Sequence, residues 1–226
     1  MCGGVRLGRA HESRRIPGEV ALTPEEFQAR AGVSRETLER FRAYAKLLIR
    51  WNRAINLVSA RSLADLWHRH FLDCAQLYPL LSRPDAVVVD LGSGAGFPGL
   101  VLAAMGAGPV HLVESDQRKA AFLREGMRLC ATNARLHVAR VETLAPWPAD
   151  VVVARALAPL DRLLGLAAPF IGASGHGLFL KGAGAADELT KAQKRWRMRV
   201  DRIPSITDPN GTIFKVRDLS RVAHSR

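Results

Sequence analysis

The sequence predicts an α/β fold, in which a seven-stranded, mostly parallel sheet follows an N-terminal helical region. After Pro84, short β-branched runs alternate with stretches of helical periodicity, which is typical of βαβ units with parallel strands. Apolar residues make up 48% of the 226 residues, so one sizeable core can form, while the chain is too short for two large domains. A glycine-rich turn beginning at Gly92 directly follows the first predicted strand.

The region before that point is expected to be entirely helical, over residues 21–83. The segment Thr23–Glu26 reads Thr-Pro-Glu-Glu and marks a helix start. Thr caps the helix, Pro fits its first position, and the second Glu lies three residues after the cap, as in a capping box. Apolar residues then recur at helical spacing, with a break near Gly32. A second cap is expected at Ser62, which would open a helix running to about Leu81.

The remaining residues up to 218 are expected to hold seven strands and four helices. The strands are Ala86–Asp90, Val110–Glu114, Leu136–Ala139, Val151–Ala154, Leu178–Lys181, Val200–Ile203 and Thr212–Val216, and the helices lie at about 98–105, 116–130, 160–170 and 185–197. No helix separates the last two strands, so we expect them to form an antiparallel hairpin after five parallel strands. This sheet is typical of the Rossmann-like class I methyltransferase fold.

The strongest motif is the turn Gly92-Ser93-Gly94-Ala95-Gly96, which is followed by Phe97. Glycines are needed where the chain turns sharply and where a ligand touches the backbone. Glu114 ends the next strand, 22 residues after Gly92, where a carboxylate can accept hydrogen bonds from a ribose diol. We therefore expect an adenosine-containing cofactor to be held by Gly92, Gly94, Gly96, Phe97 and Glu114.

Two cofactors are compatible with this pattern. Residues 94–99, Gly-Ala-Gly-Phe-Pro-Gly, match the dinucleotide fingerprint, but that match begins two residues too far beyond the strand. Residues 92–96 match the turn of S-adenosylmethionine enzymes, directly after Asp90, which we expect near the amino-acid end of the cofactor. We favour S-adenosylmethionine, with S-adenosylhomocysteine as the product. The backbone of Val141 and Glu142, after the third strand, is expected to read the adenine edge.

The segment after the fourth strand narrows the choice of the atom that is methylated. An exocyclic amine target usually needs an Asn/Asp-Pro-Pro-aromatic turn, and the chain has Ala154–Pro159 there instead. No cysteine has the setting of a pyrimidine nucleophile, and a ribose hydroxyl target would need an acid where Arg155 stands. Guanine N7 has a free lone pair and needs alignment rather than a general base. We expect Arg155 and Lys181 to orient the target through guanine O6 or phosphate, and no residue to be essential as a general base.

The formal net charge of +12 favours a polyanionic partner, although it could serve solubility alone. The candidate RNA contacts are Arg69, His70, Lys191, Lys194, Arg195, Arg197 and Arg199. Basic residues also suggest a mobile arm at 1–20 and a tail at 219–226. The three cysteines have neither disulfide nor metal-ligand spacing, and no apolar run approaches the ~20 residues of a membrane span. We expect a cytoplasmic protein without a metal.

Together these residues resemble the small-subunit ribosomal RNA guanine-N7 methyltransferases, also called the glucose-inhibited division protein B family. The resemblance rests on Trp51-Asn52 with Asn56-Leu57, Arg69-His70 with Leu72-Asp73, Asp90–Gly99, Lys119 with Phe122-Leu123, Arg140-Val141-Glu142, Arg155-Ala156 and Lys181-Gly182. The resemblance runs from about Leu38 to Gly182 and implies a bacterial enzyme that methylates N7 of one guanine in the 530 loop of 16S RNA. We expect the S-adenosylmethionine-binding methyltransferase domain to span residues 84–218. The resemblance also implies cofactor contacts at Gly92, Phe97, Val141, Glu142 and Arg155.

Other interpretations remain open for parts of this pattern. Trp51 could be a core residue, Arg69 and Asp73 could form a simple i,i+4 pair, and His70 could be a hydrogen-bonded packing residue. At the level of function, the alternatives are a methyltransferase for a small molecule or protein, a nicotinamide-dependent oxidoreductase, and a non-catalytic RNA-binding protein that keeps the fold.

Overall fold

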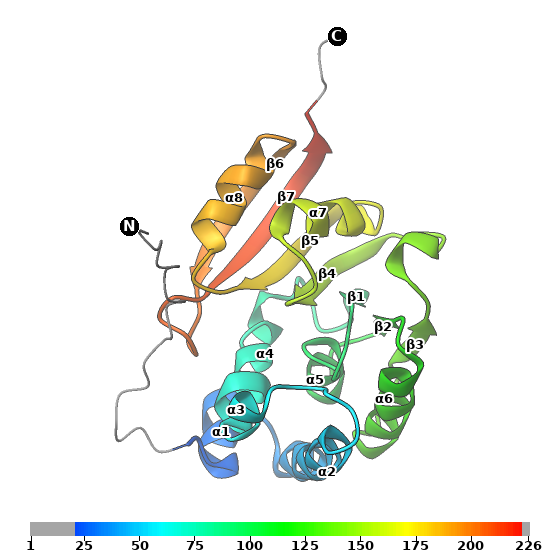
Figure 1. The fold of residues 1–226 in the computed structure, drawn as a ribbon, viewed down its shortest axis with the longest axis vertical. Helices are drawn as coiled ribbons and strands as arrows, with labels where there is room; N and C mark the ends of the chain where they lie inside the picture. The colour runs from blue at the N-terminus through cyan, green and yellow to red at the C-terminus, as the bar shows by residue number, and fades with distance from the viewer. Residues whose placement is uncertain (1–20, 223–226) are drawn as a thin grey trace, which may run out of the picture.

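The computed structural model describes residues 21–222, and helices cover both faces of its single sheet (Figure 1). The basic arm expected at residues 1–20 and the last four residues of the expected tail lie outside the described residues. Among the described residues, no helix is both long enough and apolar enough to cross a membrane.

The seven strands of the sheet follow the order β3-β2-β1-β4-β5-β7-β6. They are β1 (Val88–Leu91), β2 (Val110–Glu114), β3 (Arg135–Val138), β4 (Ala149–Arg155), β5 (Ile171–Lys181), β6 (Trp196–Pro204) and β7 (Thr212–Arg221). Strands β1 to β5 are parallel, and β7 runs antiparallel to both β5 and β6. This confirms the predicted sheet of five parallel strands and a terminal hairpin. Strand β7 extends into the tail expected from residue 219, since its residue Arg221 pairs with Trp196 of β6.

The start of the first helix and the break before the second fall where the sequence predicts. Helix α1 (Pro24–Ala31) has the predicted capping box, in which Thr23 and Glu26 bond each other's backbone N–H groups. Gly32 then takes a left-handed conformation with φ of 65°, and Ser34 caps α2 (Arg35–Asn52).

The helix start predicted at Ser62 is wrong. Ser59 is the cap of the short helix α3 (Ala60–Leu63), and its hydroxyl accepts a hydrogen bond from the Ser62 N–H at 3.2 Å. Ser59 has the extended backbone of an N-cap residue, and its hydroxyl satisfies a free N–H group of the first helical turn. Ser62 therefore lies inside the helix. The chain then continues through a π-helical segment, η1 (Trp67–Leu72), and two short turns, α4 (Asp73–Ala75) and η2 (Tyr78–Leu80).

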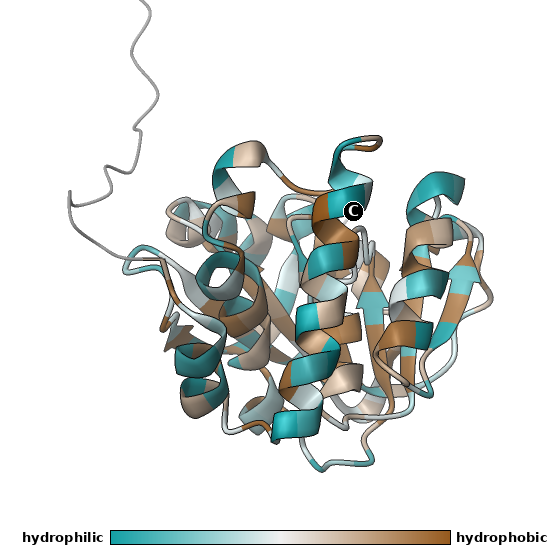
Figure 2. Ribbon diagram, turned by 90° about the horizontal axis from the view of Figure 1, so that it is seen from below, coloured by the Kyte–Doolittle hydropathy of each residue, from teal (hydrophilic) through white to brown (hydrophobic). Residues whose placement is uncertain are grey.

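Each face of the sheet has its own core. Helices α1, α2, α5 (Gly99–Ala104) and α6 (Gln117–Leu129) pack with Val88, Val110 and Val151. Helices α7 (Leu160–Ala167) and α8 (Ala185–Gln193) pack with Val89 and Val152 on the other face. Neighbouring strand residues point to opposite faces, so a strand buried on both sides reads as a continuous apolar run. Figure 2 shows hydrophilic and hydrophobic residues interleaved along the outer helices, as amphipathic packing requires.

The helix predicted over residues 185–197 ends earlier, at Gln193, and β6 begins at Trp196. The Trp196 ring is buried and its Nε1–H donates to Asp161 at 3.1 Å, which draws this segment onto α7 and into pairing with β7. Arg197 and Arg199 therefore lie on the exposed side of an edge strand, and the prediction that Arg197 belongs to the preceding helix is wrong.

Candidate active site

The glycine-rich turn connects the end of β1 to α5. Gly92, Gly94 and Gly96 have φ angles of 69°, 55° and 82°, a left-handed region that other residues rarely adopt. A side chain at Gly96 would collide with the Tyr44 hydroxyl. A Cβ at Gly94 would meet only the Gly92 carbonyl oxygen, at 3.8 Å. The backbone of Gly94 is therefore the part of the turn that a ligand can approach.

Helix α2 supports this turn from beneath. The fully buried Tyr44 donates its hydroxyl to the carbonyl oxygen of Ala95, and its ring lies 5.8 Å from that of Phe97. The sequence pattern indicated only that Tyr44 is on the buried face of a helix. Its hydrogen bond crosses 51 positions, so no local signal could reveal it.

Two carboxylates hold the turn in place. Glu114, at the end of β2, accepts from the Gly94 N–H with one oxygen and from the Asp116 N–H with the other, both at 2.8 Å. Each carboxylate oxygen has a second lone pair that remains available to a ligand. Asp90 accepts from the Gly99 N–H at 3.0 Å and is fully buried, so it shapes the turn from inside rather than facing a cofactor directly.

Burial also changes the ionisation of Asp90. Its pKa is raised to about 7, chiefly because the charged form loses its hydration, while hydrogen bonds from Ser93 and Gly99 oppose that shift. The second oxygen of Asp90 is buried and has no hydrogen-bond partner among the described residues.

The two residues expected beside the adenine lie in a single turn of 3₁₀ helix, η3 (Val141–Thr143). Val141 is buried against the core of the α7 face. The Glu142 side chain is directed toward Arg162 of α7, with 3.6 Å between Oε1 and Nη2. Glu142 also lines a cavity of about 490 Å³ between α7 and β6.

Arg155, at the end of β4, is the centre of a buried polar network. Its guanidinium lies over the Phe97 ring, 5.0 Å from the centroid. Nη2 lies 2.6 Å from His70 Nδ1, and Nη1 donates to the Arg69 carbonyl oxygen at 3.0 Å. Burial and the Arg155 charge lower the pKa of His70 to about 3, so the imidazole is neutral and accepts through Nδ1.

This network bears on the alternatives that the helical motif leaves open. Asp73 binds Arg155, with 3.2 Å between Oδ2 and Nη1, and the i,i+4 pair with Arg69 that the spacing allows does not form. The π-helical segment and Arg155 converge at this point, so Asp73 meets a largely buried cation whose side chain is 18% exposed. His70 is only 7% exposed and stacks on Phe97 at 4.9 Å, so it is a packing residue with little surface left for an RNA contact, whereas Arg69 is exposed.

The other conspicuous sequence motif is structural. The Trp51 Nε1–H donates to Glu125 of α6 at 3.0 Å. Asn52 Oδ1 accepts from the N–H groups of Leu57 and Val58, both at 2.9 Å, and so closes the loop after α2.

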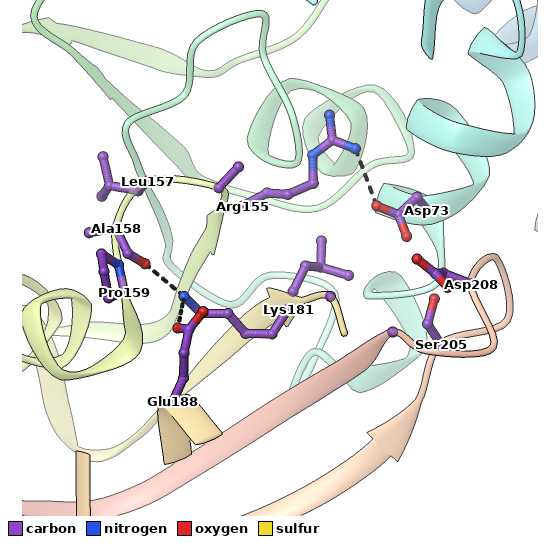
Figure 3. Close-up of a pocket in the computed structure, with 13 residues that line it drawn as sticks. Asp73, Arg155, Leu157, Ala158, Pro159, Lys181, Glu188, Ser205 and Asp208 are labelled. Atoms are coloured by element: carbon purple, nitrogen blue, oxygen red, sulfur yellow. Dashed lines mark hydrogen bonds and ion pairs between the residues drawn. The ribbon is translucent and has the colours of Figure 1, made fainter. Parts of the chain in front are cut away.

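A cleft of about 540 Å³ opens where β4 and β5 end, next to the loop between β6 and β7 (Figure 3). Arg155 and Lys181 both line it, as the sequence predicts for the ends of these strands. Lys181 donates to the Ala158 carbonyl oxygen at 2.7 Å and pairs with Glu188 at 2.8 Å. Glu188 also accepts from the Leu160 N–H at 2.7 Å. Lys181 and Glu188 therefore fix the loop that follows β4.

The remaining cationic candidates lie at the opposite end of the β6–β7 hairpin from the cleft. Lys191, Lys194, Arg195, Arg197 and Arg199 are all exposed. Arg195 pairs with Asp161 at 2.9 Å and Arg199 with Asp218 at 3.1 Å. Within residues 21–222, the other three have no ion-pair partner.

A glycine turn after β1, an acid ending β2 and a cleft at the ends of β4 and β5 define the class of Rossmann-like S-adenosylmethionine-dependent methyltransferases. A TehB-like S-adenosylmethionine-dependent methyltransferase from Corynebacterium glutamicum shares this fold, with a TM-score of 0.51 at 16% identity, over 80% of this chain and 97% of that one. TYW2 of M. jannaschii, solved in complex with AdoMet, also shares it, with a TM-score of 0.50 at 16% identity, over 65% of this chain and 74% of that one.

The family model described as rRNA small subunit methyltransferase G matches residues 37–212. Ribosomal RNA small subunit methyltransferase G of Paramagnetospirillum magneticum is 57% identical over 200 residues, which cover 88% of this chain and 98% of the relative. The chain belongs to this family and is a methyltransferase. The resemblance and the methyltransferase fold predicted from the sequence are thereby confirmed, and a nicotinamide-dependent oxidoreductase is not supported.

Proposed function

We propose that the protein transfers a methyl group from S-adenosylmethionine to N7 of a guanine in the 530 loop of bacterial 16S ribosomal RNA, releasing S-adenosylhomocysteine. The names of its relatives support the ribosomal small subunit as the substrate. We further propose that it acts in the cytoplasm and without a metal. The observation that carries the choice of N7 is the cleft, because every carboxylate lining it is already engaged within the protein.

The residues at the glycine turn fit the proposed cofactor. Gly94 leaves its backbone open, and Glu114 retains lone pairs that can accept from a ribose diol. Gly92, Gly96 and Phe97 would complete the wall of the site, with the backbone of Val141 and Glu142 on the adenine side. When bound, the cofactor supplies an electrophilic methyl group on a sulfonium.

Each carboxylate that lines the cleft already accepts a hydrogen bond or pairs with a cation within the protein. Asp73 binds Arg155 and the Thr207 hydroxyl, Glu188 binds Lys181 and the Leu160 N–H, and Asp208 accepts from the Asn210 N–H at 2.9 Å. N7 of guanine has an in-plane lone pair and no proton to remove, so it reacts without a base once it is aligned.

The cysteines of the described residues cannot replace a base with a nucleophile. Burial raises the pKa of Cys130 to about 12 and that of Cys74 still further, so both remain thiols. This agrees with a reaction that forms no covalent bond between protein and base.

Arg155 and Lys181 would orient the target. The Arg155 guanidinium lies over the Phe97 ring, and its planar fork can present further N–H donors to guanine O6 or a phosphate. Two N–H groups of the Lys181 ammonium bind Ala158 and Glu188, and the third N–H remains available to the substrate. The exposed cations on α8 and β6, together with Arg69, would bind RNA phosphates.

Methyl transfer from labelled S-adenosylmethionine to small subunits from a strain lacking this protein tests the proposal. Digestion of the RNA to nucleosides should yield labelled 7-methylguanosine, and mapping should place it in the 530 loop. The rate should show no ascending limb that reports deprotonation of a base. Recovery of 5-methylcytosine, an N6-methyladenine or a 2′-O-methyl nucleoside would contradict the proposal. No transfer to any RNA would favour a non-catalytic RNA-binding protein.

A further inference from the structure

The loop between β6 and β7 exposes a large apolar side chain. Ile206 is 62% exposed, and Ile49 on α2, at 42%, is the other large hydrophobic residue exposed within residues 21–222. An exposed isoleucine gains free energy whenever a partner removes it from water. Whether Ile206 can contact a substrate depends on where it lies relative to the cleft.

The exposure of Ile206 is not a result of a loose loop. The Gly211 N–H donates to the Asp208 carbonyl oxygen at 2.8 Å, and the Ser205 N–H donates to the Gly211 carbonyl oxygen at 3.1 Å. The Ser205 and Thr207 hydroxyls are hydrogen-bonded at 2.9 Å. A loop closed by its own hydrogen bonds presents its side chains in one conformation, which lowers the entropy cost of binding.

The same loop is anchored to the N-terminal helical region. The Ile206 N–H donates to Gln76 Oε1 at 2.9 Å, and Gln76 Nε2 donates to the Ser205 hydroxyl at 3.2 Å. The Thr207 hydroxyl donates to Asp73 Oδ1 at 2.5 Å, while the other oxygen of Asp73 binds Arg155. The backbone that carries Ile206 is thus tied to the network that positions Arg155.

The loop lies at the edge of the cleft. Ser205, Asp208 and Gly211 line the cleft, and Figure 3 shows Ser205 and Asp208 beside Asp73. Ile206 is on the same loop but does not line the cleft. Ile206 would therefore contact the RNA around the target guanine, and not the guanine itself.

We propose that Ile206 is an RNA-contact residue, which packs on an unstacked base next to the methylated guanine. This inference rests on the proposed function. A guanine presented to an enclosed cleft leaves its neighbours with exposed faces, and such faces are what proteins contact when they bind unpaired RNA. Arg202, an exposed cation on the strand leading into the loop, has no ion-pair partner within the described residues and suits the adjacent phosphate. Gln76 is then a positioning residue, which acts through the loop backbone.

Ile206→Ala tests the contact, and Ile49→Ala is the matched control on a different face. Ile206→Ala should raise KM for the small subunit roughly fivefold or more, from the apolar area lost, and leave the Kd for S-adenosylmethionine unchanged. Ile49→Ala should leave both constants at their wild-type values. Equal KM values for the two variants would overturn the proposal.

A photoreactive amino acid placed at position 206 identifies the partner directly. It should crosslink to 16S RNA close to the methylated guanine, and the same group at position 49 should not. Crosslinking from position 206 to a ribosomal protein, or to nothing, would overturn the RNA contact.

The role of Gln76 has its own readout. Gln76→Ala should raise KM in the wild-type background and raise it by clearly less in the Ile206→Ala background, because the two changes share the loop contact while Gln76 also donates to the Asp73 side chain at 3.0 Å. Full additivity would overturn the positioning role. These outcomes are distinct from failure of the proposed function, since that would appear as absence of 7-methylguanosine with the wild-type protein.

Discussion

Glu114 combines two tasks in one carboxylate. It holds Gly94 and Asp116 through their N–H groups, and it is the residue best placed to accept from a ribose. Glu114→Ala should therefore weaken S-adenosylmethionine binding by roughly 1.5–3 kcal/mol, the usual scale for hydrogen bonds to a charged group. Isothermal titration calorimetry measures this directly.

Glu142→Ala is the control for that experiment. Its side chain pairs with Arg162, and only its backbone is expected to reach the cofactor, so affinity should change little. Equal losses in the two variants would show that the ribose is not read by Glu114, and tighter binding of NAD than of S-adenosylmethionine would contradict the cofactor assignment altogether.

Asp90 makes stability depend on pH. Because burial raises its pKa from 3.8 to about 7, the folded protein holds a proton that the unfolded chain releases between these values. The free energy of unfolding should therefore fall as pH rises through this window, by at most about 1.4 kcal/mol per pH unit. Asp90→Asn keeps an acceptor for the Gly99 N–H and removes the ionisation, so its slope should be flatter.

Urea denaturation between pH 5 and pH 8 measures the two slopes. Asp85→Asn changes an exposed carboxylate by the same chemistry and should keep the wild-type slope. If wild type and Asp90→Asn give parallel curves, the buried carboxyl group does not titrate in this range.

At the scale of elements, α2 supports the glycine turn of the proposed cofactor site although it lies before the sheet in sequence. Tyr44→Phe keeps the buried ring but leaves the Ala95 carbonyl oxygen without the hydroxyl donor. Loss of a buried partner should lower the free energy of unfolding by about 1–3 kcal/mol. It should also weaken S-adenosylmethionine binding, since the glycine turn rests on this hydrogen bond.

Chemical denaturation and calorimetry on the same variant separate the two effects. Tyr78→Phe, at the other tyrosine of the chain, should leave the affinity for S-adenosylmethionine unchanged. A Tyr44→Phe protein that loses stability but binds the cofactor normally would limit α2 to a packing role.

Local chemistry explains which elements the sequence predicts well. The alternation of apolar strands with helices, the capping box at Thr23 and the glycine turn depend on neighbours within a few positions, and these features were confirmed. The boundary at Trp196 depends on a hydrogen bond to Asp161 and on pairing with β7, so charge and periodicity misplaced it.

The candidate site divides in the same way. Glu114 and the glycines could be placed from strand ends, because consecutive parallel strands end at one edge of the sheet. The bond between Arg155 and Asp73 spans 82 positions, and its charge pairing emerges only when the helical region packs on β4. Arg69 is the nearer candidate partner of Asp73 in sequence, but Asp73 pairs with the more distant Arg155 instead.

At the scale of the whole molecule, exposed cations lie along the length of the β6–β7 hairpin, among them Arg197, Arg202 and Arg217. Ile206 and the cleft-lining residues Ser205 and Asp208 lie in the loop that follows β6, whereas Lys194 and Arg197 lie at the start of that strand. Figure 1 shows β6 and β7 as a long hairpin at the edge of the sheet. A strand of nine residues spans roughly 30 Å at about 3.3 Å per residue, so one RNA segment bound at both ends must follow the hairpin.

Removing the charges at the far end should therefore weaken RNA binding without touching the chemistry. The Lys194→Ala/Arg197→Ala variant should raise KM for the small subunit and lower the slope of log affinity against log salt by roughly 1.4–1.8, from two phosphates no longer neutralised. kcat at saturating substrate should remain that of the wild type, because neither side chain reaches the cleft. Arg124→Ala/Arg128→Ala removes the same charge from exposed positions on α6 and controls for a general effect of net charge. If both double variants shift the slope equally, the excess positive charge acts at long range and the hairpin is not the path of the RNA.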